Sequence, residues 1–255
     1  PQIDKKPIYI KNQIAKKLNQ EIPNTIYQTW VSKYLPRKLA INVKKFRSIN
    51  KDYSFIIFDD NERDDYMKEK WSHNPIYKIY LNSVFQASKA DIFRYCILYE
   101  KGGFYFDIKS GCKIPISKLK ISRGAIISHE NTISTFPPNL DSIESSKYPF
   151  NIIKNWAFGF KKNHPFLKNI IEEIIKYAPF YKNYIFTNPK NAIISFTGPG
   201  MMTNVYRKYI INKEDRIDPL GIDFNGNGIY ELDGSSLRFE SSKSYALIKN
   251  SKILN

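Results

Sequence analysis

Cysteine, histidine and long apolar runs are scarce in this sequence. Its 255 residues include two cysteines, Cys96 and Cys112, and three histidines. Two cysteines are too few for a disulfide-stapled domain, and they favour a reducing, cytoplasmic setting. No uninterrupted apolar run approaches the roughly 20 residues of a membrane-spanning helix, and residues 1–6 contain no signal-peptide core. The sequence does not begin with Met, which leaves room for an anchor or a targeting segment upstream.

Motifs of nucleic-acid-binding proteins are also missing. The formal net charge is +16, but the lysines are spread along the chain, and no zinc-finger, RNP-type or basic-zipper pattern occurs. We therefore expect no nucleic-acid partner. The charge favours a phosphorylated substrate, or peripheral contact with an anionic membrane such as an inner membrane face.

Strand and helix patterns alternate through the first half of the chain. Neither repeats nor a low-complexity linker interrupts it, so we expect a single domain over residues 21–255, preceded by a basic arm or short helix over 1–20. The alternation predicts an α/β fold with a mostly parallel central sheet flanked by helices. The expected strands are 25–31, 53–58, 104–107, 125–128 and 156–160, and the expected helices are 36–49, 61–70, 75–85, 88–101, 165–177 and 201–211.

Three segments concentrate residues suited to ligand binding. Residues 22–30 read IPNTIYQTW, residues 87–109 contain ASKADIFRY followed by GGFYFDIK, and residues 196–200 read FTGPG. Asp91 and Arg94 stand three apart on a predicted helix, so they share one face. This spacing is typical of a ligand-binding pair, and equally of a simple ion pair on a solvated face.

The central segment predicts its own boundaries. Ser88 is expected to cap the helix, and Gly102 and Gly103 to end it. Asp107 then ends the following strand. Ligands bind at the carboxyl ends of strands in such sheets, so Asp107 is expected at a binding site. By contrast, Asp223 lies in a stretch that lacks the spacing of a calcium loop and is interpreted as a turn.

The three segments together resemble glycosyltransferase family 32. That family shows an I-P-x-x-I-H-Q-T-W strand, a K-x-D-x-x-R-Y helix followed by G-G-x-Y-x-D-x-D, and a later T-G-P, and the resemblance covers residues 22–203. It implies a GT-A-like nucleotide-sugar-binding domain. It also implies a retaining transfer of a hexose from a UDP- or GDP-sugar to a glycan or lipid-linked acceptor, in surface polysaccharide or glycan synthesis.

The resemblance assigns roles to particular residues. Trp30 is expected to stack on the donor base, although a core position would explain a tryptophan equally well. The expected catalytic residues are Asp91, Arg94, Asp107 and Lys109. The expected donor-binding residues are Gln28, Thr29, Trp30, Asp91, Arg94, Tyr95, Gly103, Asp107, Thr197 and Gly198, and the acceptor is assigned to Asn155 and Trp156.

The sequence departs from the family where a divalent cation, usually Mn²⁺, is expected. Lys109 replaces the second aspartate, no histidine stands near the C-terminus, and Tyr27 replaces the histidine of the first strand. Three alternatives follow: Lys109, assisted by Lys249, stabilises the leaving diphosphate without metal; Asp107 holds Mn²⁺ or Mg²⁺ with diphosphate oxygens and water; or the chain is a catalytically weak nucleotide-sugar or carbohydrate-binding protein.

Overall fold

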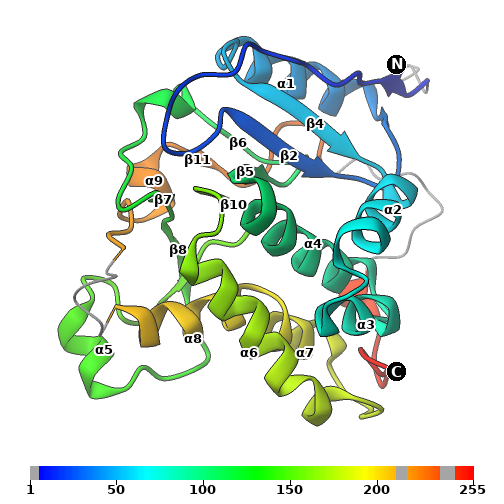
Figure 1. Cartoon of the computed structure of the whole chain (residues 1–255), viewed down its shortest axis with the longest axis vertical. Coiled ribbons are helices and arrows are strands. Elements are labelled where there is room, and N and C mark those ends of the chain that lie inside the picture. Colours follow the sequence, from blue (N-terminus) through cyan, green and yellow to red (C-terminus); the bar gives the residue numbers. More distant parts are fainter. Residues whose placement is uncertain (1–5, 211–216, 236–244) are drawn as a thin grey trace.

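A five-stranded sheet forms the centre of the protein (Figure 1). The computed structural model describes residues 6–210, 217–235 and 245–255. The strand order is β4 (Ser54–Phe58), β2 (Thr25–Thr29), β5 (Gly103–Phe106), β10 (Ala157–Phe160) and β7 (Ala125–Ile126). The pairs β4–β2 and β2–β5 are parallel, whereas β5–β10 and β10–β7 are antiparallel. The α/β fold is therefore confirmed, but the sheet is mixed, because its parallel strands all come from the first 106 residues.

Helices cover both faces of this sheet. The helices are α1 (Arg37–Ser48), α2 (Asp60–Trp71), α3 (Pro75–Asn82), α4 (Gln86–Lys101), α5 (Leu140–Ser145), α6 (Pro165–Tyr181), α7 (Pro189–Phe196), α8 (Pro199–Tyr209) and α9 (Asp223–Gly226). Figure 1 shows α1 on one side of the sheet, with α4 and α6 on the other. Alternate residues of β5 serve the two faces: Phe104 and Phe106 join one buried cluster, and Tyr105 joins the other. None of the helices in the described ranges is long and apolar enough to cross a bilayer.

Three short ribbons complete the described chain. They pair β1 (Ile8–Tyr9) with β3 (Tyr34–Leu35), β6 (Gly111–Cys112) with β11 (Gly228–Ile229), and β8 (His129–Ile133) with β9 (Asn151–Ile153). Two 3₁₀ turns, η1 (Ile116–Lys118) and η2 (Tyr245–Leu247), lie between them and near the C-terminus. Residues 6–20 run as an extended arm without helix, and Gln13 forms an antiparallel bridge with Phe55 at the outer edge of β4.

The helix that carries Asp91 starts earlier than the sequence predicted. α4 begins at Gln86, its N-cap is Phe85, and no side chain caps it. Ser88 lies inside the first turn, where its buried Oγ has no partner among the described residues, so the prediction of a Ser88 cap was wrong. Gly102 ends the helix with a φ of 67°, as expected.

Candidate active site

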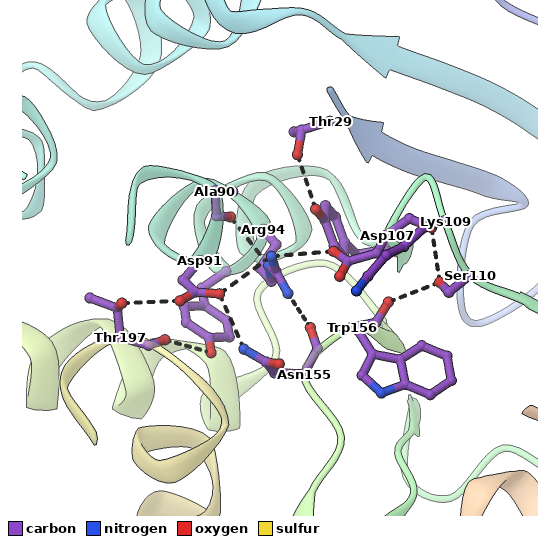
Figure 2. Close-up of polar contacts among 12 residues, drawn as sticks. Thr29, Ala90, Asp91, Arg94, Asp107, Lys109, Ser110, Asn155, Trp156 and Thr197 are labelled. Carbon is purple, nitrogen blue, oxygen red and sulfur yellow. Dashed lines mark hydrogen bonds and ion pairs between the residues drawn. The ribbon is translucent and has the colours of Figure 1, made fainter. Parts of the chain in front are cut away.

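Asp91 lies at the centre of a buried polar cluster. Its carboxylate accepts hydrogen bonds from Asn155 Nδ2 and Thr197 Oγ1, both at 3.1 Å, and Arg94 Nη2 lies 3.3 Å away (Figure 2). The side chains of Arg94 and Asp91 are only 7% and 9% exposed. The alternative of an ion pair on a solvated helix face is therefore excluded. The carboxylate instead ties α4 to the β9–β10 connection and to the turn between α7 and α8.

Arg94 links this cluster to the end of β5. Its guanidinium lies 3.4 Å from Asp107 Oδ1, donates to the Asn155 carbonyl and to Ala90 O at 3.2 Å, and stacks over the Tyr105 ring at 4.4 Å. Burial lowers the pKa of Arg94, but Tyr105, Asp107 and Asp91 together raise it above its ordinary value. Arg94 is thus a fixed cation shared by two carboxylates.

Asp107 presents its carboxylate at the carboxyl end of β5. Its amide N–H donates to Trp156 O at 2.8 Å, and its carbonyl accepts from the Ser110 amide and hydroxyl at 2.8 and 2.9 Å. The Asp107 side chain is 25% exposed, far more than that of Asp91. Of the two carboxylates held by Arg94, Asp107 is therefore the one placed to touch a ligand.

Burial shifts the titration of Asp91. Desolvation raises the pKa of Asp91 to about 6, against the opposing effects of Arg94, Thr197 and Asn155. The carboxylate is therefore ionised at neutral pH and takes up a proton under mildly acidic conditions. Protonation weakens the pairing with Arg94, which in turn orients Asp107.

Lys109 contacts two residues of the segment after β11. Its Nζ donates to Tyr230 Oη at 2.9 Å, lies 3.4 Å from Glu231 Oε1 and sits 4.0 Å from the centre of the Tyr230 ring. Burial lowers the pKa of Lys109, but the hydrogen bond and charge of Tyr230 outweigh it, so the pKa is raised. Lys109 is thus an ammonium ion at neutral pH. Two of its three N–H donors are directed to Tyr230 and Glu231, which leaves one for a ligand.

The described side chains offer a divalent cation few ligands at this site. No group of three or more His, Cys, Asp or Glu residues suited to a metal occurs within residues 6–210, 217–235 and 245–255. Asp107 is also the only carboxylate of the D-I-K segment, and Arg94 already lies against it. The Lys109 ammonium further raises the positive charge there, since Asp107 is among the charges that act on it. A divalent cation would be the third positive charge here, and it would have to be held by Asp107 with diphosphate oxygens and water, so the metal-free and metal-dependent alternatives both stay predictions.

Neither of the two tryptophans assigned to ligand contact is fully exposed. Trp156 is 4% exposed, with Lys154 Nζ 3.7 Å from the centre of its ring and the Tyr230 ring edge-on at 5.4 Å. Trp30 is half-buried and packs against the cluster around Leu39, while its indole N–H has no partner among the described residues. Base stacking by Trp30 and acceptor contact by Trp156 both stay predictions.

Two residues predicted to bind the donor, Tyr95 and Gly103, have a role in packing. Tyr95 is fully buried, and its hydroxyl donates to Thr197 O at 2.9 Å. Gly103 starts β5 at the end away from Asp107, and a Cβ there would lie 2.6 Å from Thr25 O. Tyr95 thus supports the Thr197 turn and Gly103 lets β5 lie against β2, while donor contact by either residue stays a prediction.

The remaining predicted residues fall into two groups. Thr29 and Thr197 belong to the polar cluster, since Thr29 Oγ1 lies 3.1 Å from Tyr105 Oη and Thr197 binds Asp91. Gln28 is buried with its Oε1 unpartnered among the described residues, and Gly198 is the N-cap of α8. Lys249 is exposed, and no contact between described residues joins it to Lys109.

The sequence did not reveal a second buried ion pair beside the site. Lys154 is fully buried and binds Asp223, whose side chain is 36% exposed. Burial lowers the pKa of Lys154, and Asp223 partly restores it. The two residues stand 69 positions apart, so no local pattern could pair them. Tyr230 was also missed, because no motif or spacing in the sequence around it marks a ligand site.

The mixed sheet with charged groups at the end of β5 defines a GT-A-like fold. A solved structure, the PaToxG glycosyltransferase, superposes with a TM-score of 0.50 at 16% sequence identity, over 76% of this chain and 74% of that one. At this level of identity, the likeness supports the fold alone.

Sequence comparisons identify similar glycosyltransferases. Residues 36–132 match the family described as "Glycosyltransferase sugar-binding region containing DXD motif". The inositol phosphoceramide mannosyltransferase 1 of Schizosaccharomyces pombe is 28% identical over 82% of this chain and 59% of its own length. The initiation-specific alpha-1,6-mannosyltransferase of Candida albicans is 25% identical over 76% of this chain and 54% of its own length. The chain spans about half the length of the curated relatives it matches. These matches confirm the resemblance to family 32.

Proposed function

We propose that this chain transfers a hexose from a nucleoside diphosphate sugar to a glycan or lipid-linked acceptor. The observation that carries the proposal is that one buried arginine, Arg94, contacts two carboxylates. These are Asp91 in the core and Asp107 at the carboxyl end of β5. All three residues lie within the region matched by the glycosyltransferase family. Such a rigid pair of carboxylates is suited to hydrogen-bonding sugar and ribose hydroxyls.

The names of the relatives narrow the substrates to test. They are mannosyltransferases, which makes a mannosyl donor the first hexose to try. Several are named for inositol phosphoceramide or its mannosylated product, which makes a lipid-linked acceptor the first acceptor class. The net charge of +16 is consistent with a phosphorylated donor and an anionic acceptor.

The chemistry follows from which charges face the ligand. Asp107 would bind the donor, and the remaining N–H of Lys109 would neutralise charge on the departing diphosphate. The bond between the anomeric carbon and the diphosphate oxygen breaks through an oxocarbenium-like transition state. The acceptor oxygen attacks from the same face, which retains configuration, and its proton passes to the departing phosphate. The sequence shows no obvious enzymatic nucleophile, which is why we expect the departing phosphate to take this proton.

Release of nucleoside diphosphate tests this proposal. UDP- and GDP-sugars, including a mannosyl donor, are incubated with the chain and candidate acceptors, in EDTA and in Mn²⁺. We expect one donor to be turned over in EDTA, and Lys109→Ala to lose most of that turnover. Lys120→Ala, which removes an exposed lysine elsewhere, serves as the matched control. Unchanged turnover of Lys109→Ala without metal would refute the role of Lys109.

A catalytically weak nucleotide-sugar-binding protein is the second candidate. It is favoured by the contacts of Lys109 with Tyr230 and Glu231, which compete with a phosphate for the ammonium. Calorimetric titration separates the two candidates. Tight donor binding with no release of nucleoside diphosphate across the acceptors would establish the binding protein, whereas turnover would exclude it.

A further inference from the structure

One end of the molecule gathers three segments that are distant in sequence. They meet at the lower right of Figure 1. The segments are residues 75–85, which include α3, residues 176–190, which run from the end of α6 to the start of α7, and residues 245–255 at the C-terminus. Backbone hydrogen bonds connect them: Val84 N donates to Ile253 O at 3.0 Å, and Asn183 N donates to Leu254 O at 2.9 Å. We call this surface, made of these three segments, the α3–α6 end.

Apolar side chains protrude from the α3–α6 end. Phe180 and Leu247 are each 75% exposed, which is unusual for side chains of this size. Others accompany them, so water covers a cluster of apolar groups rather than a single one. The exposed apolar residues of this surface are Leu81, Val84, Tyr177, Phe180, Tyr184, Ile185, Leu247 and Ile248.

All charged side chains within the three segments are positive, although Lys176 lies 3.7 Å from Glu173, one turn earlier on α6. The three segments contain six lysines and no aspartate or glutamate. Long lysine side chains can lie along apolar surface while their ammonium groups reach outward. These lysines are Lys78, Lys176, Lys182, Lys190, Lys249 and Lys252.

A second apolar surface provides a contrast. Ile133 and Phe150 flank α5, and Leu140 and Ile143 lie on it; Leu140 is 77% exposed. Acidic residues Asp141 and Glu144 share this helix, so the apolar groups there are mixed with negative charge. Exposure alone therefore does not set the α3–α6 end apart. The absence of acidic residues from its three segments does.

We propose that the α3–α6 end docks on the surface of an anionic lipid bilayer. Phenylalanine and tyrosine rings are suited to the boundary between headgroups and acyl chains, and lysines beside them are attracted to anionic headgroups. Neither element alone holds a protein firmly on a membrane, but the two act together. Docking does not depend on the transferase reaction. If the acceptor is lipid-linked, docking also brings the enzyme to its substrate.

Co-sedimentation with vesicles tests the docking. The full chain is mixed with vesicles of phosphatidylcholine alone, or of phosphatidylcholine with phosphatidylserine, at several salt concentrations. We expect the bound fraction to be about tenfold higher on the anionic vesicles and to fall as salt rises. Equal binding to both kinds of vesicle, or none to either, would overturn the proposal.

Matched variants assign the binding to this surface. Phe180→Ser combined with Leu247→Ser is expected to reduce binding about tenfold, whereas Leu140→Ser, which removes an equally exposed side chain from α5, leaves it unchanged. Replacing Lys78, Lys182 and Lys190 with Gln should reduce binding more than replacing the exposed Lys44, Lys118 and Lys120. Circular dichroism verifies that each variant folds.

Two outcomes would contradict the assignment to the α3–α6 end. In the first, the control variants lose as much binding as the surface variants. In the second, vesicles do not bind the chain, but Phe180→Ser abolishes self-association in sedimentation velocity. That result would make the surface a contact between copies of the chain. A Trp placed by Ile185→Trp adds a direct readout, because brominated lipids should quench its fluorescence only if this segment enters the bilayer.

Discussion

Two buried cations, Arg94 and Lys154, differ in the exposure of the carboxylates beside them. Arg94 serves Asp91 and Asp107, whose side chains are 9% and 25% exposed. Lys154 is itself fully buried, yet its partner Asp223 is 36% exposed. Two ion pairs with buried cations can therefore differ in how far water reaches the carboxylate. We expect a buried carboxylate to depend strongly on its cation, and a carboxylate that water reaches to tolerate the loss of its cation.

Removal of Arg94 is expected to have the largest effect. Arg94→Met leaves Asp91 buried without its cation, which should reduce the free energy of unfolding by about 3–5 kcal/mol. Urea unfolding measures this loss. Arg94→Lys, which keeps the charge but loses the fork geometry, should retain part of the stability. A loss below about 1 kcal/mol in Arg94→Met would show that the burial of Asp91 matters little.

Asp107→Asn should separate function from stability. The amide is isosteric and the position is partly exposed, so the melting temperature should change little. Turnover of the donor should fall by about 10²–10³ if Asp107 contacts the reacting sugar. Asp141→Asn on α5 is the matched control, and it should keep normal turnover. Normal turnover in Asp107→Asn would place the reaction elsewhere.

Lys154→Met should cost less than Arg94→Met. Asp223 can recover its hydration, so the expected loss in the free energy of unfolding is about 1–2 kcal/mol. Lys154 also lies against the Trp156 ring, so we expect the KM for the acceptor to rise while donor affinity is unchanged. A loss equal to that of Arg94→Met would remove the distinction between the two pairs.

The last effect concerns the pH dependence of stability. Burial raises the pKa of Asp91 from 3.8 to about 6, so between about pH 4 and pH 6 the folded chain holds a proton that the unfolded chain has released. The contribution of Asp91 to stability therefore grows as pH falls through this window and is lost as pH rises. Asp91→Asn should lack this component, by on the order of 2 kcal/mol between pH 4 and pH 7. Parallel unfolding curves of both proteins across this range would contradict the shift.

The sequence predicted those members of the Arg94 cluster that lie close together along the chain. Spacing placed Asp91 and Arg94 on one helix face, the end of the following strand placed Asp107 at the ligand edge of the sheet, and the family resemblance joined the three. Their burial was not visible, because it depends on Asn155 and Thr197 from later elements. The pairing of Lys154 with Asp223 had no local signal.

Other differences have similar physical origins. The Ser88 cap failed because packing extended α4 back to Gln86 and buried the hydroxyl. The sheet became mixed because β10 runs antiparallel to β5, a relation that strand propensity does not encode. Tyr95 follows Arg94 directly, but the next position on a helix turns by about 100°, which points Tyr95 into the core.

The most direct test of the central claim restores the family's second aspartate. The wild type should release nucleoside diphosphate equally in EDTA and in Mn²⁺, because the Lys109 ammonium supplies the positive charge. Lys109→Asp should be inactive in EDTA and regain turnover with Mn²⁺, since two carboxylates would then be available to a cation. A wild type that stops in EDTA, together with a Lys109→Ala variant that works normally, would contradict the account.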